Sequence, residues 1–125
     1  MSANRVTRQK ALKWGAVAEY AAAFFLILKA YQILAIRYRI KEGEIDLIAR
    51  RGQVIAFIEV KARADFETGI LAIDETKLRK FRKAVDHWVI RNPWAETYTL
   101  RGDAIVVRPW RIPVHIEDAF ALALS

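Results

Sequence analysis

The stretch GEIDLIARRGQVIAFIEVKAR, residues 43–63, decides the fold. Its two halves, 44–49 and 54–63, are rich in β-favouring residues and are joined by RRGQ, so we predict a β-hairpin. Alternate residues of 54–63 point to opposite faces, and both faces begin apolar, which is typical of a central strand covered on both sides. Asp46, Glu59 and Lys61 interrupt this apolar hairpin. Burial without a partner costs roughly 2 to 7 kcal/mol even for a neutral polar group, so we expect something to compensate these charges.

The register of the hairpin determines whether the three charges meet. If Arg51 and Gly52 form a two-residue turn, Asp46 stands opposite Phe57, and Asp46, Glu59 and Lys61 share one face. Asp46 and Glu59 are then diagonal neighbours, with Cα atoms roughly 7 to 8 Å apart. We therefore expect the two carboxylates to be able to close on one cation.

Two such carboxylates would raise each other's pKa, and a divalent cation with a preference for oxygen ligands relieves that repulsion. Mg²⁺, or Mn²⁺ in its place, suits a site of one or two carboxylates plus a substrate phosphate. Lys61 could orient or deprotonate the attacking water, or stabilise charge on the phosphate. The pattern favours a phosphodiester hydrolase. The alternative is a structural one, in which Asp46 pairs with Lys61, Glu59 pairs with an arginine, and nothing is catalysed.

The remainder of the chain predicts a single α/β domain over residues 1–125. We expect helices over 7–30 and 74–90, with Asp74 as the cap of the second, and a loop or lid over 64–73. We expect further strands at 32–40, 97–101 and 103–108, and a terminal helix from about Glu117. Glu19 falls on an otherwise apolar face of the first helix, because Leu12, Ala16, Ala23 and Leu26 recur with it at spacings of three and four.

Composition excludes several kinds of site. The chain of 125 residues has no cysteine, which excludes disulfides and thiolate zinc sites. Its only serines are Ser2 and Ser125 at the two ends, which argues against a Ser-His-Asp triad. The apolar run 20–28 is shorter than the about 20 residues of a membrane-spanning helix, so we expect no membrane partner. A secretory signal is the rival interpretation of that run, but its removal would delete a helix, and we expect a cytoplasmic protein.

A net charge of +7 favours a polyanionic partner such as DNA. Basic residues crowd the start of the second helix and could contact a phosphate backbone, although a solvated helix face is the alternative. They are Lys77, Arg79, Lys80, Arg82 and Lys83. We expect Trp88 to be a core residue, and His87, His115 and Asp103 to be structural. The sequence leaves Trp94 and Trp110 open between core packing and base stacking.

These motifs also resemble a known family. EID followed by EVK is similar to the Asp, then Glu-x-Lys, signature of the restriction-endonuclease-like nucleases. The wider pattern resembles the YraN-type family of small bacterial proteins. This chain has Ile45 where the nuclease class often has a proline before the Asp, and much of the YraN-type family shares this departure. This pattern comprises Gly15, Glu19, GEIDLIA, FIEVKAR, Lys77, RGD and HIEDAF.

The resemblance implies a restriction-endonuclease-like fold, with a central mixed β-sheet flanked by helices, related to Holliday-junction resolvases. It implies that Asp46 and Glu59 bind the metal, that Lys61 is catalytic, and that Glu19 reaches the site as a further ligand. We therefore expect a Mg²⁺- or Mn²⁺-dependent endonuclease acting on DNA, including branched or irregular DNA. The alternatives are a nucleic-acid-binding module that keeps the fold without cutting, and a basic interaction protein. A homodimer would suit the cutting of two strands, but the sequence identifies no interface.

Overall fold

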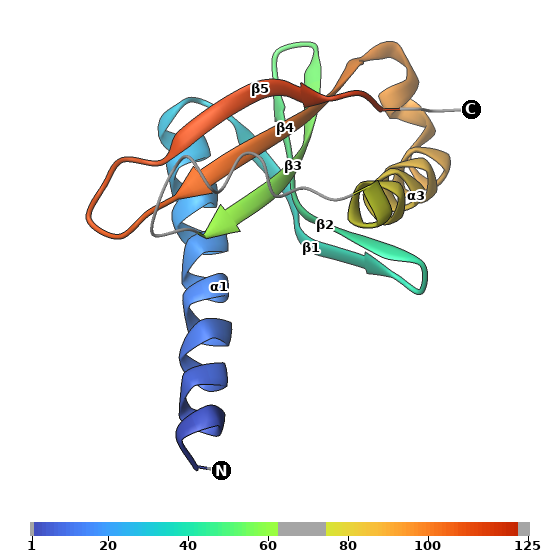
Figure 1. Ribbon diagram of the computed structural model, residues 1–125. Coiled ribbons are helices and arrows are strands. Elements are labelled where there is room, and N and C mark those ends of the chain that lie inside the picture. Colours follow the sequence, from blue (N-terminus) through green and yellow to red (C-terminus); the bar gives the residue numbers. More distant parts are fainter. Residues whose placement is uncertain (1, 63–74, 123–125) are drawn as a thin grey trace.

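The computed structural model describes residues 2–62 and 75–122, with side chains from Trp14 onward in those ranges. It forms a five-stranded sheet in the order β1-β2-β3-β4-β5, with α1 on one face and α3 on the other (Figure 1). Only β3 and β4 run parallel in this sheet, and the other neighbours are antiparallel. The predicted α/β class and the mixed sheet between helices are therefore confirmed. The elements are α1 (Ser2–Leu28), β1 (Gln32–Ile40), β2 (Gly43–Arg51), β3 (Val54–Ala62), α3 (Glu75–Arg91), η1 (Pro93–Thr97), β4 (Thr99–Val107) and β5 (Val114–Phe120).

Small side chains bring α1 close to the sheet. Ala18, Ala22 and Ala23 are buried with Leu26 against apolar residues of β2, β3 and β4. The helix ends in a Schellman motif, because Tyr31 N–H donates to the Leu26 carbonyl at 2.9 Å and Ala30 N–H donates to the Ile27 carbonyl at 3.0 Å. Ala30 occupies the left-handed position of this motif, with φ +69°.

Aromatic residues fill the opposite face of the sheet, below α3. Phe57 packs edge-on against Trp88 with ring centroids 5.4 Å apart, and Phe81 packs in the same way against Phe120 at 5.2 Å. Trp88 is buried, as predicted. The alternation predicted for β3 is confirmed, because Ala56 and Ile58 face α1 while Ile55 and Phe57 face α3.

The β2–β3 turn differs from the prediction. Arg51 pairs with Val54, so Gly52 and Gln53 form the turn, and Gly52 has the positive φ of +60° that such a turn requires. The register is consequently displaced by two residues from the expected one, since Ile48 and not Asp46 pairs with Phe57. A displacement of two residues preserves the face of every side chain.

The carboxyl-terminal part also differs. One strand, β4, continues through Gly102 where two strands were expected, and β5 runs to Phe120 where a helix from Glu117 was expected. Gly102 lets β5 approach, because a Cβ there would lie 2.6 Å from the Phe120 carbonyl oxygen. The predicted loop 64–73 and the cap Asp74 lie outside the described residues. Within the described part of the chain, we find no helix with the length and apolarity to cross a membrane.

Candidate active site

Asp46 lies where β2 and β3 separate. Their ladder ends at the pair Leu47 and Ile58, so Asp46 and Glu59 are the residues that lie just beyond the last pair on each strand. The Asp46 Oδ2 atom accepts a hydrogen bond of 2.7 Å from the Val60 backbone N–H. This bond fixes the carboxylate in the gap between the strands, and Oδ1 can still face a cation.

Burial and neighbouring charge act together on Asp46. Its residue is 9% exposed, and burial, followed by the charge of Glu59, raises the pKa of Asp46 from 3.8 to about 7. The Val60 hydrogen bond opposes this rise without cancelling it. Among the described residues Asp46 makes no ion pair, so the Asp46–Lys61 pair of the structural alternative is absent. A positive charge next to Asp46 would favour its ionised form and lower its raised pKa.

Glu59 and Lys61 follow on β3, both buried and on the α3 side. Lys61 Nζ donates to Glu59 Oε1 at 3.4 Å, and Lys77 Nζ from α3 lies 3.3 Å from the same oxygen. Burial, together with the Lys77 charge, lowers the pKa of Lys61 below its usual 10.5 although Glu59 acts in the opposite direction. For Lys77 burial is outweighed by Glu59, and the pKa of Lys77 lies above 10.5. The partners of Glu59 are therefore lysines and not the arginine of the structural alternative.

Glu19 approaches this group from α1. Its Oε1 accepts a bond of 2.5 Å from Arg37 Nε, which ties α1 to β1. Its charge also raises the pKa of Asp46, as a smaller cause than burial or Glu59. Glu19 is thus within electrostatic reach of Asp46, but its direct partner is Arg37. Sequence reasoning missed this arginine, because a contact between residues 19 and 37 leaves no local signal.

Asp103 gives the contrasting case of a buried aspartate. It accepts hydrogen bonds from Arg101 at 2.8 Å, His115 at 2.7 Å and the Asp118 N–H at 3.0 Å. Burial alone would raise its pKa, but the bonds from His115 and Arg101 outweigh burial and hold the pKa of Asp103 below 3.8. The RGD and HIEDAF motifs therefore meet in a structural network around β4 and β5, as expected for Asp103 and His115. His87 likewise has a partner, the Tyr38 hydroxyl at 2.6 Å.

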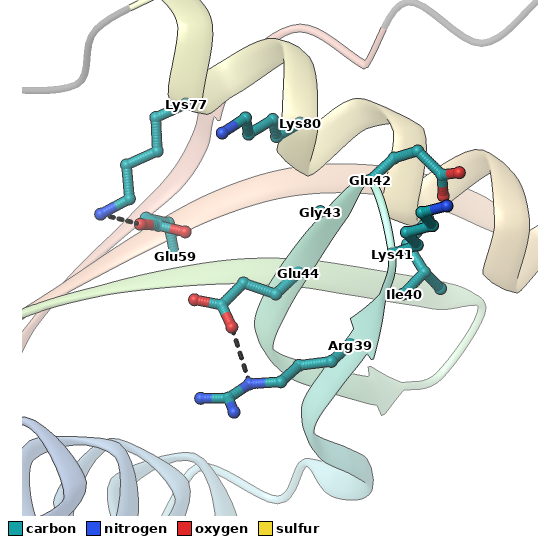
Figure 2. A pocket seen from close by; sticks show the side chains of 9 residues that line it. All are labelled: Arg39, Ile40, Lys41, Glu42, Gly43, Glu44, Glu59, Lys77 and Lys80. Atoms are coloured by element: carbon teal, nitrogen blue, oxygen red, sulfur yellow. Dashed lines mark hydrogen bonds and ion pairs between the residues drawn. The ribbon is translucent and has the colours of Figure 1, made fainter.

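A cavity of about 460 Å³ opens beside Glu59, between the β1–β2 turn and α3 (Figure 2). Figure 2 shows Lys77 reaching toward Glu59, and Lys80 extending from the same helix toward the Lys77 side. Arg39 and Lys41 line the cavity from the turn, and the sequence reasoning did not single them out. Glu42 and Glu44 line the same turn, and Arg39 Nε donates to Glu44 Oε2 at 2.9 Å. The turn therefore carries both signs of charge, and the basic side of the cavity is the one formed by α3.

The predicted basic cluster divides in the structure. Lys77 and Lys80 line the cavity, whereas Arg79 and Lys83 are exposed elsewhere on α3. Arg82 donates to the Ala121 carbonyl at 3.0 Å and pairs with Glu75 at 3.4 Å, so it holds the carboxyl-terminal segment against the helix. Trp94 packs edge-on against Trp88, and Trp110 is fully exposed.

No three acidic, histidine or cysteine side chains among the described residues are grouped so that they could hold a metal ion together. The pair that the hairpin itself brings together is Asp46 and Glu59, whose hard oxygen donors match Mg²⁺ or Mn²⁺. Both carboxylates are buried, and the pKa of Asp46 is raised first by this burial and then by the charge of Glu59. The donor set present therefore fits a divalent cation held by two carboxylates, with other ligands from water or substrate.

Comparison with known proteins identifies the family of the chain. Residues 18–107 match the family described as "Uncharacterised protein family UPF0102". The chain belongs to the UPF0102 family. A UPF0102 protein of Sinorhizobium fredii is 49% identical over 122 residues, which cover 96% of this chain and all of that protein. UPF0102 proteins of Sinorhizobium medicae and Agrobacterium fabrum are 51% and 49% identical, over 89% and 90% of this chain and 91% and 93% of theirs.

Proposed function

We propose that this UPF0102 protein is a metal-dependent nuclease that hydrolyses phosphodiester bonds in DNA, including branched or irregular DNA. One observation carries the proposal. Asp46 is buried with its pKa raised to about 7, next to the Glu59 carboxylate, while Asp103 in the same sheet is fully compensated. A buried carboxylate whose pKa is raised in this way lowers the stability of the fold at neutral pH, and such perturbed groups concentrate at functional sites.

The chain's own groups supply the remaining requirements of the reaction. Asp46 and Glu59 would hold Mg²⁺ or Mn²⁺, which on binding supplies activation of water and neutralisation of phosphate charge. Burial lowers the pKa of Lys61, so this amine is better suited than an exposed lysine to exchange a proton with the attacking water or the leaving oxygen. Glu19 would act on the site through its charge, and Arg37 positions it.

Lys77 and Lys80 would contact the phosphate backbone where the cavity meets Glu59. The salt bridge between Lys77 and Glu59 holds the Lys77 ammonium at the carboxylate that a cation would also contact. A phosphate entering with the cation offers Lys77 a replacement partner, because both are anionic oxygens. Arg79 and Lys83 would contribute long-range attraction only.

The finer fold assignment is part of the proposal. The mixed sheet between α1 and α3, with the aspartate on β2 and Glu-x-Lys on β3, supports the restriction-endonuclease-like fold and a relation to Holliday-junction resolvases. We place the protein in the cytoplasm, where DNA is available and where a chain without cysteine needs no oxidising compartment.

Cleavage assays test the function directly. Purified protein is incubated with labelled duplex, single-stranded and four-way-junction DNA in Mg²⁺, Mn²⁺ or EDTA, beside Asp46→Asn, Lys61→Ala and the matched control Asp86→Asn on α3. We expect metal-dependent cutting by the parent chain and the control, and at least a 100-fold loss in the two site variants. Cutting that survives in both site variants would refute this active site.

Binding without cutting under every metal would instead support the non-catalytic nucleic-acid-binding module. If the chain neither cuts nor binds DNA, and is not retained on heparin at moderate salt, the basic interaction protein is supported. These outcomes are distinguishable because binding is measured by fluorescence anisotropy on the same substrates.

A further inference from the structure

Helix α1 is apolar on two opposite sides. Ala18, Ala22 and Leu26 face the sheet and are buried. On the other side an outer stripe of large apolar side chains is more than half exposed: Val17 53%, Tyr20 64%, Phe24 62% and Ile27 55%. A helix that is apolar all round is normally covered all round, and Figure 1 shows α1 lying against the sheet on one side only.

The outer stripe adjoins an apolar groove. A cavity of about 760 Å³ lies between α1 and the connection from β4 to β5, with Phe24 and Leu28 on one side and Trp110 and Ile112 on the other. Leu28, Trp110 and Ile112 are 70%, 101% and 76% exposed. Together with the outer stripe, these side chains expose on the order of 1,000 Å². A standard interface buries about 800 Å² on each partner, so this surface is large enough for a stable one.

We propose that the outer stripe and the adjoining groove bind a second copy of this chain, with the two α1 helices packed side by side and antiparallel. The spacing of the stripe supports a helix as the occupant, because residues 17, 20, 24 and 27 follow the three-four repeat of a helix–helix seam. A twofold pair uses the same surface on both chains, and the stripe meets that condition when position 17 of one chain lies across from position 27 of the other.

Charge favours the antiparallel arrangement. Continued toward the amino end, the repeat meets Lys13 and Lys10. A parallel pair would stack each lysine position of the sequence on itself, whereas an antiparallel pair separates positions 10 and 13 of one chain from positions 10 and 13 of the other.

Light scattering coupled to size exclusion tests the pairing. We expect the parent chain to be a dimer at 100 μM, Ile27→Glu to raise the dimer dissociation constant at least 100-fold, and Ile90→Glu to leave it unchanged. Ile90 is the matched control, since it is an isoleucine on α3 that is 77% exposed. Circular dichroism establishes that both variants are folded. A monomeric parent chain, or equal effects of the two variants, would overturn the proposal.

Disulfide trapping tests the orientation, because the chain has no cysteine of its own. Val17→Cys and Ile27→Cys chains are mixed and oxidised, and we expect the mixed disulfide to exceed both self-disulfides. A predominance of 17-to-17 links would overturn the antiparallel arrangement. A parent chain that stays monomeric and co-sediments with anionic phosphatidylglycerol vesicles would assign the surface to lipid and overturn the proposal.

Discussion

Asp46 and Asp103 are both buried in one sheet, and their surroundings drive their pKa values in opposite directions. Three donors surround Asp103, while the Val60 N–H is the bond that holds Asp46. Removing Asp103 would leave its arginine and histidine partners unsatisfied, which is a structural loss. Removing the charge of Asp46 would increase the stability of the fold, because a buried carboxylate without a cationic partner destabilises it. A residue that lowers stability in this way is expected to serve function.

Replacement of Asp46 should therefore stabilise the fold in a pH-dependent way. The folded-state pKa of about 7 exceeds the ordinary 3.8, so the folded chain binds more protons than the unfolded chain between these values. Stability contributed by protonated Asp46 is present below about pH 4 and is lost as pH rises through 7. We expect Asp46→Asn to raise the free energy of unfolding by roughly 2 to 4 kcal/mol at pH 8 and little at pH 4, measured by urea denaturation. An equal gain at both pH values, or the same gain in Asp86→Asn, would contradict this origin.

A divalent cation should stabilise the parent chain by acting on the same carboxylates. Ligand at 100 times its dissociation constant adds about 2.7 kcal/mol, which corresponds to a rise of several degrees in Tm. We expect Mn²⁺ and Mg²⁺ to raise Tm at pH 8 and much less at pH 5.5, where protons compete for Asp46. Scanning fluorimetry should show the rise abolished in Asp46→Asn and Glu59→Gln and retained in Asp86→Asn. A metal-induced rise in all three variants would place the cation elsewhere.

The residue types of this site were predictable, and their partners were not. Charges inside an apolar hairpin single out Asp46, Glu59 and Lys61, because such burial requires compensation. The Arg37 partner of Glu19 and the backbone bond to Asp46 depend on how α1 and the diverging strands meet in three dimensions. The turn at Gly52 and Gln53, one residue later than predicted, displaced the register by two residues, so Asp46 and Glu59 lie just beyond the last pair of the β2–β3 ladder.

At the scale of elements, the β1–β2 turn and α3 enclose the cavity because their backbones nearly touch. A Cβ on Gly43 would clash with the backbone carbonyl of Lys80, and backbone atoms cannot move aside as a flexible side chain can. Gly43 thus sets the distance between the turn and the helix, and with it the width of the cavity beside Glu59.

Gly43→Ala should push the turn away from α3. We expect a loss of about 1 to 3 kcal/mol in the free energy of unfolding, as for other overpacked contacts, and weaker DNA binding at the cavity. Gly15→Ala is the matched control. It lies in α1 with nothing within 4 Å of the point that its added methyl group would occupy, and should gain roughly 0.5 to 1 kcal/mol from helix propensity. Chemical denaturation measures both, and a neutral Gly43→Ala would show that the turn relaxes freely.

The strand β5 shows where element prediction fails. Residues 114–120 were expected to pass from strand to helix at Glu117, yet they form one strand that pairs with β4 from Val114 to Ile116 and again at Phe120, with an irregularity between these pairs. The pairing places His115 against Asp103, and Asp118 N–H donates to the same carboxylate across 15 residues of sequence. Such long-range contacts override local propensity. The hairpin, β1 and both long helices were predictable because their periodicity is local.

For the whole molecule, a net charge of +7 attracts any polyanion, so binding to DNA alone would not locate the site. The structure provides a sharper comparison within one helix. Lys80 lines the cavity with Glu59, while Lys83, three residues later, is exposed but does not line it. Both substitutions remove one charge, so their long-range effects on DNA attraction are equal.

Lys80→Ala and Lys83→Ala should consequently differ in the salt dependence of DNA binding. Each phosphate contact that releases a counterion contributes about 0.9 to the slope of log K against log salt for duplex DNA. We expect Lys80→Ala to reduce that slope by about 1 and to weaken affinity several-fold on every sequence, whereas Lys83→Ala leaves the slope unchanged. Fluorescence anisotropy titrations between 50 and 300 mM NaCl, in Ca²⁺ or EDTA to prevent turnover, measure both variants. If Lys83→Ala has the larger effect, DNA lies across the outer face of α3, and the cavity beside Glu59 is not where the backbone enters.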